Sequence, residues 1–184
     1  MDFKGYSVIG KSKEKFGASV SAIGDFNNDG LADLAVGYVF PKFYLTLSKD
    51  NTQHFTPPYS TFSSPGSSSS PGSVVVVFGS TKTPAHSIDV SSLDGVVGTV
   101  FVGINYGDKF GYSVGPAGDY NLDGVADMIV GAPTAGSNGV VYVLYGQSKH
   151  FPSTTKMDAL TPYSGTTFPA SSAQSGLGHS VWGG

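Results

Sequence analysis

Two nine-residue acidic loops constrain this chain more than any other feature of its sequence. The first spans Asp25–Asp33 and the second spans Asp119–Asp127. Each has oxygen-bearing side chains at positions 1, 3, 5 and 9, with glycine at position 6. Calcium is bound in proteins by about six to eight oxygen atoms, and a glycine in such a loop permits the sharp turn that gathers them. Each loop is therefore predicted to be a calcium site.

The predicted ligands in each loop are the side-chain oxygens of three Asp and one Asn, together with one backbone carbonyl. An oxygen-only set without His or Cys argues against zinc or copper. Three carboxylates exceed the charge of one divalent ion by one, which favours calcium over a monovalent ion. The predicted metal residues are Asp25, Asn27, Asp29, Leu31 (carbonyl), Asp33, Asp119, Asn121, Asp123, Val125 (carbonyl) and Asp127.

Two other interpretations of the loops need to be weighed. An EF-hand loop opens in the same way but requires a bidentate Glu at position 12. That position is Val36 in one copy and Val130 in the other, and strand-like sequence flanks both loops, so an EF-hand is excluded. The second alternative is a hairpin turn that binds nothing, because Asp, Asn and Gly favour turns in any case. Both copies keep every ligand position while positions 2, 4 and 7 vary, which favours an ion site.

The loops lie within a larger internal repeat. Residues 16–37 and 110–131 are identical at 13 of 22 positions, at an offset of 94. Further along, residues 73–79 match residues 140–146 at an offset of 67. The repeat period is therefore 67 residues, and the first unit carries an insertion within 38–72. Part of this insertion is rich in Ser, Pro and Gly, a composition typical of a surface loop.

Short runs of Val and aromatic residues between frequent Gly and Pro predict an all-β fold with many turns. Four strands per unit at this period predict β-propeller-type blades of four antiparallel strands, about two and a half of them in the chain. Within one domain of residues 1–184, the predicted units are an outer strand at 3–10, repeats at 16–103 and 110–170, and the start of a further blade at 177–184. Tyr145 is predicted to be a core residue, and Trp182 a core or interface residue.

No arrangement of residues in the sequence indicates catalysis. The four His are scattered, and no zinc-protease, nucleophile-elbow, phosphate-loop or dinucleotide motif occurs. The chain has no Cys, which excludes disulfides and thiolate metal sites. The two loops hold six of the 13 acidic residues, and no polybasic stretch suggests a nucleic-acid partner. No apolar run approaches the roughly 20 residues of a membrane helix. The chain is predicted not to be an enzyme and not to insert into a membrane.

The residues around the acidic loops resemble FG-GAP repeats, the blades of integrin α-subunit propellers and of similar microbial proteins. Phe16-Gly17 leads into the first loop and Phe110-Gly111 into the second, and the second copy continues into Gly131-Ala132-Pro133. The first copy departs from this pattern at Gly37-Tyr38-Val39, and the start of the third unit has Leu177 in place of Phe. The resemblance covers nearly the whole chain outside the insertion.

The resemblance implies a calcium-stabilised propeller module of an extracellular or cell-surface protein that serves adhesion or recognition. In that family the calcium loops are mainly structural and lie on the face away from the ligand-binding loops. The expected partner is another protein or further copies of this chain. The alternative is an accessory propeller or carbohydrate-binding module of a secreted enzyme, with a glycan as partner.

Blades with open ends expose unpaired strand edges, which invite pairing with other chains. Three arrangements are therefore open at this point. The chain is part of a larger propeller, or its copies complete one another in a ring or filament, or it is a short β-structure with covered edges.

Overall fold

The computed structural model describes residues 7–9, 16–38, 70–81, 87–136, 138–171 and 175–183. The predicted insertion at 38–72 lies outside these residues except at its two ends, and so do residues 3–6 and 10 of the predicted outer strand. The regular elements of the described residues are strands and two short 3-10 helices. No helix in these ranges is long and apolar enough to cross a membrane.

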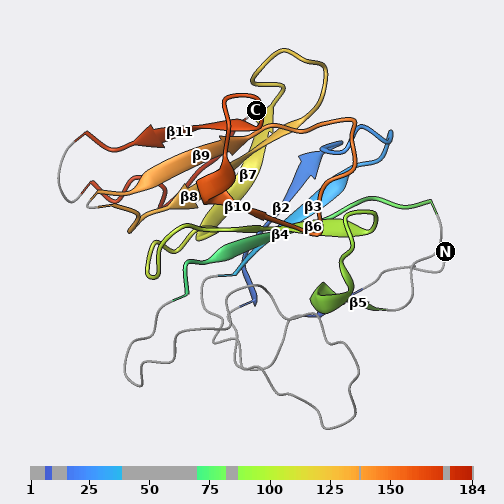
Figure 1. The fold of residues 1–184 in the computed structure, drawn as a ribbon, viewed down its shortest axis with the longest axis horizontal. Coiled ribbons are helices and arrows are strands. Elements are labelled where there is room, and N and C mark those ends of the chain that lie inside the picture. Colours follow the sequence, from blue (N-terminus) through green and yellow to red (C-terminus); the bar gives the residue numbers. More distant parts are fainter. Residues whose placement is uncertain are drawn as a thin grey trace, which may run out of the picture.

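Two antiparallel sheets form the body of the molecule, one from each repeat (Figure 1). The first sheet consists of β2 (Phe16–Gly24), β3 (Asp33–Tyr38), β4 (Ser73–Val77) and β6 (Gly98–Val102). The second consists of β7 (Ser113–Gly118), β8 (Asp127–Ala132), β9 (Val140–Leu144) and β11 (Gly165–Pro169). Within each sheet these four strands lie side by side in chain order and every neighbouring pair is antiparallel. The prediction of all-β blades with four antiparallel strands is confirmed.

The Val-rich central strand of the first sheet is buried on both faces. Val74 and Val76 of β4 belong to the core that lies between the two sheets, whereas Val75 and Val77 belong to a separate core on the opposite face. Successive strand residues point to opposite faces, so a strand that is covered on both sides becomes a continuous apolar run.

Strand β1 (Ser7–Ile9) lies within the outer strand predicted at residues 3–10. Four further short elements were not predicted, and each lies between the third and fourth strands of its repeat. They are β5 (Ser87–Asp89) and the 3-10 helix η1 (Val90–Ser92) in the first repeat, and β10 (Thr154–Lys156) and the 3-10 helix η2 (Met157–Ala159) in the second. Strand β10 comes from the second repeat but pairs in parallel with β6, which makes the first sheet five-stranded. Strands of three residues are too short to show an alternating pattern, and only their pairing identifies them.

Strand β1 stands where the outer strand of a preceding sheet would stand. It pairs in parallel with β5, with Ser7 opposite Ser87. The equivalent pair one repeat later is β6 with β10, with Val100 opposite Thr154. Strand β1 therefore has the same relation to the first repeat as β6 has to the second.

A serine and a glycine of the repeat connect each inner strand to the unit that follows. The Ser19 hydroxyl donates to the carbonyl of Gly111 at 2.9 Å, and the Ser113 hydroxyl donates to the carbonyl of Gly178 at 2.8 Å. A Cβ at Gly37 would lie 2.0 Å from the Gly111 carbonyl oxygen. Only glycine permits this approach, so the repeated Ser and Gly mark the contact between neighbouring units.

The core between the sheets is built around large side chains from both repeats, among them Phe26, Phe110, Met128 and Phe151. Of the two alternatives predicted for Trp182, the core is excluded because its side chain is 79% exposed, and a position at an interface stays a prediction. The prediction that Tyr145 is a core residue needs correction. Tyr145 is only partly buried, because it lies on the face of the second sheet that points away from the first.

Candidate metal centre

Both acidic loops connect the first two strands of a sheet. The first loop joins β2 to β3, and the second joins β7 to β8. A β-bulge precedes each loop, where Gly24 pairs with Asp33 and Gly118 pairs with Asp127. Both glycines have positive φ, 79° and 70°, as a bulge of this kind requires. Position 9 of each loop is thus the first residue of the strand that leaves it.

The carboxylate at position 1 holds the turn of the loop. In the first loop, Asp25 Oδ1 accepts the N–H of Asp29 at 2.9 Å and Oδ2 accepts the N–H of Gly30 at 2.7 Å. Asp119 accepts the matching amides in the second loop at 3.0 and 2.9 Å. The glycines at position 6 have φ of 88° and 87°, as expected for this sharp turn.

Positions 3 and 5 are linked to each other. Asn27 Oδ1 accepts the N–H of Asp29 at 3.2 Å, and Asn27 Nδ2 donates to Asp29 Oδ2 at 2.9 Å. Asp29 Oδ1 accepts the N–H of Leu31 at 2.9 Å. The same three contacts recur in the second loop, among Asn121, Asp123 and Val125. The structure therefore brings the predicted donors at positions 1, 3 and 5 together around one turn.

The carboxylate at position 9 lies beneath the turn. Asp33 is 2% exposed and Asp127 is fully buried. Asp33 Oδ2 accepts the N–H of Phe26 at 2.9 Å, and its Oδ1 accepts the N–H of Gly79 at 2.8 Å. Asp127 accepts the equivalent amides of Tyr120 and Gly146, each at 2.8 Å. This residue thus connects the loop to the third strand of its own sheet.

The pKa of Asp33 is raised from 3.8 to about 6, mainly by burial and to a smaller extent by the charge of Asp29, while the amides of Gly79 and Phe26 act in the opposite direction. Burial likewise raises the pKa of Asp127, with Asp123 as a smaller cause. Each loop therefore contains negative charge that its own amides do not fully compensate.

The donor chemistry of the loops fits a hard cation, because every candidate atom is a carboxylate, amide or carbonyl oxygen. In the described part of the chain, however, no three His, Cys, Asp or Glu side chains form a ready-made metal cluster. The carboxylates instead accept N–H groups of their own loop and, at position 9, of Gly79 or Gly146 after the third strand. The donors are thus gathered in each loop, but their oxygens point at amides.

Two residues of this framework were not among the predicted site residues. Gly79 and Gly146 follow β4 and β9, and their amides hold the buried carboxylates. A Cβ at Gly79 would lie 2.6 Å from Cβ of Leu31, so the strand end must be glycine to approach the loop. Their recurrence at the repeat offset of 67 is the signal in the sequence that identifies them.

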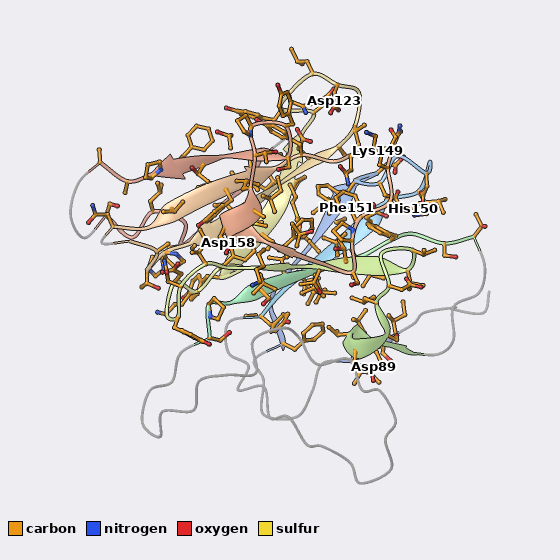
Figure 2. The ribbon with its side chains drawn as sticks, in the orientation of Figure 1. Asp89, Asp123, Lys149, His150, Phe151 and Asp158 are labelled. Carbon is orange, nitrogen blue, oxygen red and sulfur yellow. The ribbon has the colours of Figure 1, made fainter. Side chains whose placement is uncertain are left out.

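The surroundings of the two loops differ. The second repeat covers the first loop, where Ala126 N–H donates to the Asp25 carbonyl at 3.4 Å and Gln147 N–H donates to the Phe26 carbonyl at 3.0 Å. The second loop lies at the periphery of the molecule, as the position of Asp123 in Figure 2 shows. Among the described residues, no amide donates to the carbonyls at the same positions of the second loop.

Comparison with known proteins matches both loop regions. The sequence profile of the FG-GAP repeat family matches residues 16–39 and 110–144. Integrin alpha pat-2 of Caenorhabditis elegans is 36% identical over 134 residues, which cover 71% of this chain. Integrin alpha pat-2 of Caenorhabditis briggsae is 35% identical over 129 residues, or 68% of this chain. The matched region spans 9% of the length of each of these relatives.

Proposed function

The chain belongs to the FG-GAP repeat family, and from this premise we propose that it is a calcium-binding, non-catalytic module of an extracellular adhesion protein. The integrin relatives support the adhesive role and the location outside the cell or at its surface. The chain covers a small part of those proteins, so its partner is proposed only as a class, namely another protein.

The observation that carries the calcium proposal is the duplicated loop framework. Two loops separated by 94 residues make the same contacts through the same donors, and each holds a buried acid whose pKa is raised. A turn that merely reversed the chain would not need three carboxylates at matching positions. A divalent ion would supply the positive charge that each loop lacks.

The position of the donors favours a structural role for the ion. The loop donors lie between the first two strands of each sheet, and the buried Asp also reaches the third strand through Gly79 or Gly146. Ion binding would exchange some of the present amide contacts for bonds to the metal. The ion would then hold three strands of one sheet together rather than activate a substrate.

The proposal is tested by calorimetric titration of the chelator-treated protein with calcium. We expect about two sites, loss of one site in Asp29→Ala or in Asp123→Ala, and loss of both in the double variant. Asp158→Ala is the matched control, because this exposed acid lies outside the loops in the short helix η2.

A titration without heat, together with an unchanged melting temperature in calcium, would refute calcium binding. Equal responses to calcium and magnesium would refute the assignment of the metal but not the site.

A further inference from the structure

The two acidic loops meet where the second repeat covers the first loop. The carbonyl at position 1 of the first loop, that of Asp25, accepts the N–H of Ala126 at 3.4 Å. The carbonyl at position 2, that of Phe26, accepts the N–H of Gln147 at 3.0 Å. Ala126 is position 8 of the second loop, and Gln147 directly follows Gly146, whose N–H donates to the buried acid of that loop. We call these five residues the loop junction.

Gly146 is close to both loops. Its N–H donates to Asp127 Oδ1 at 2.8 Å. A Cβ at this position would lie 2.3 Å from the Ala126 carbonyl oxygen in the second loop and 2.8 Å from the Phe26 carbonyl oxygen in the first. Both distances are too short for a Cβ, so only glycine lets this strand end fit between the two loops.

Backbone hydrogen bonds continue from this strand end to the buried acid of the first loop. Gln147 N–H donates to the Phe26 carbonyl at 3.0 Å. This carbonyl shares a planar peptide group with the N–H of Asn27, which donates to Asp33 Oδ2 at 3.3 Å. The N–H of Phe26 donates to the same oxygen at 2.9 Å. The buried acids Asp127 and Asp33 are thus joined through the backbone of the loop junction.

The first repeat has no equivalent contact on its other side in the described part of the chain. Gly79 is the equivalent of Gly146, and the three atoms nearest to a Cβ there belong to Leu31 and Ala32 of its own loop. Among the described residues, no amide donates to the carbonyls at positions 1 and 2 of the second loop. The loop junction therefore occurs once in these residues, and it joins the two predicted ion sites to each other.

We propose that the two calcium sites are coupled through the loop junction, so that calcium bound at either loop raises the affinity of the other. This inference rests on the proposed function, because it concerns the ions of the same two loops. An ion that orders the second loop also orders Gly146 and Gln147 through Asp127. Less ordering of the first loop then accompanies binding of its own ion. Coupling between two sites is reciprocal, so an ion in the first loop has the same effect on the second.

Repulsion between the two bound cations acts against this coupling. At 0.15 M salt the repulsion is screened over about 8 Å, and at 1 M salt over about 3 Å. The hydrogen bonds of the loop junction join backbone groups without net charge, so they depend little on salt. We therefore expect the coupling at 1 M salt to equal or exceed the coupling at 0.15 M salt, and its loss at 1 M salt would overturn the inference.

Calorimetric titration of the whole chain with calcium measures the coupling. The product of the two stepwise association constants of the unaltered chain is divided by the product of the single-site constants of Asp123→Ala and Asp29→Ala. Independent sites give a ratio of 1, and we expect a ratio of at least about 5. Two bound ions with a ratio of 1 or less would overturn the inference and leave the proposed function intact.

Gln147→Pro breaks the loop junction without changing a predicted calcium ligand. Proline has no N–H, so the Phe26 carbonyl loses its donor from the second repeat. Gln147→Ala is the matched control, because it removes the side chain and keeps the N–H. With the same titrations in each background, we expect the ratio to fall at least threefold in Gln147→Pro and to be retained in Gln147→Ala. An unchanged ratio in folded Gln147→Pro would overturn the inference.

Hydrogen exchange measured by NMR covers the case in which Gln147→Pro does not fold. In Asp29→Ala only the second loop is expected to bind calcium, so any change in the first loop has crossed the loop junction. We expect saturating calcium to slow exchange of the Phe26 amide at least threefold in this variant, and to have no effect in Asp29→Ala with Asp123→Ala.

The amide of Gly146 distinguishes the two ways in which the exchange experiment can fail. Slower exchange of Gly146 with unchanged exchange of Phe26 would show that the second loop binds calcium without affecting the first, and would overturn the inference alone. Unchanged exchange of both amides, together with a titration without heat, would refute calcium binding and the inference with it.

Discussion

The first and second acidic loops share every internal hydrogen bond described above but differ in what surrounds them. Phe26, at position 2 of the first loop, is fully buried against Phe151, whereas Tyr120, at position 2 of the second loop, is half exposed. Two backbone amides of the second repeat donate to carbonyls of the first loop. The Asn28 side-chain amide donates to the Ser148 hydroxyl at 2.7 Å as well.

The hydrogen bonds within each loop are thus the same in both repeats, whereas the contacts that a loop receives from a neighbouring repeat differ. The framework of acids and amides depends on nine residues and one glycine of the same sheet, so it forms in both repeats. The contacts around the loop come from the neighbouring unit, so they differ between the two loops. We expect the two loops to respond alike to changes within the framework and unequally to changes at their surroundings.

The largest expected difference is in the stability lost by the variants Phe26→Ala and Tyr120→Ala. Removal of a fully buried aromatic ring typically costs about 3–5 kcal/mol, because it leaves a cavity in the core. Removal of the half-exposed Tyr120 should cost about 1 kcal/mol or less. Urea unfolding of the two variants measures both values. Similar losses of stability would show that the two loops are equally supported.

Gly37 and Gly131 occupy equivalent positions in β3 and β8, the second strand of each sheet. A Cβ at either position would lie 2.0 Å from a carbonyl oxygen of the following unit, that of Gly111 or Gly178. Gly111 lies between the two sheets, with Ser73 of the first and Gly131 of the second beside it, whereas Gly178 follows β11, the last strand of the second sheet. We expect Gly37→Ala to lower the free energy of unfolding by about 3 kcal/mol and Gly131→Ala to lower it by about 1 kcal/mol. Thermal unfolding of the variants provides the measurement, and a larger loss for Gly131→Ala would contradict this interpretation.

The buried acids should make the stability of both repeats depend on pH in the same direction. Burial raises the pKa of Asp33 to about 6, so between about pH 4 and pH 6 the folded protein binds more protons than the unfolded chain. The contribution of Asp33 to the stability of the metal-free protein is therefore greatest below about pH 4, and it falls as the pH rises towards 6. We expect the free energy of unfolding to fall by about 2 kcal/mol over this range. This is less than the full pKa shift would give, because the rest of the loop faces solvent and screens the charge.

Denaturation of chelator-treated protein between pH 4 and pH 7 measures this dependence. Asp33→Asn should flatten the curve in part, and Asp127→Asn should do so in the same direction, since burial raises both pKa values. Saturating calcium should reverse the trend, because the ion favours the ionised carboxylates. A stability that rises with pH in the metal-free protein would contradict the assignment.

The smallest expected effect is the difference in calcium affinity between the loops. The first loop is held by the second repeat, so less ordering accompanies ion binding there. We expect it to bind calcium about tenfold more tightly, a difference of about 1.4 kcal/mol. Titration of Asp123→Ala isolates the first site, and titration of Asp29→Ala isolates the second. Equal affinities would show that coverage of a loop does not contribute to ion binding.

The sequence alone predicts the sheets and the internal arrangement of the loops. Asp at positions 1, 5 and 9 and Gly at position 6 act within a single hairpin, so their pattern is visible in one short segment. The period of 67 residues reveals the four strands of each unit for the same reason. It also relates Gly79 to Gly146, although their role as donors to Asp33 and Asp127 is seen only in the structure.

The tertiary structure alone decides which surfaces of these equal units are covered. Phe26 and Tyr120 occupy the same position of the same motif, and no local pattern distinguishes a buried ring from an exposed one. The difference arises because Phe151, from a distant connection, packs on the first ring and not on the second. Likewise, β10 adds to the sheet of the other repeat through non-local pairing. Local chemistry therefore determines the loops and strands of this protein, and long-range packing determines which of its two faces remains open to a partner.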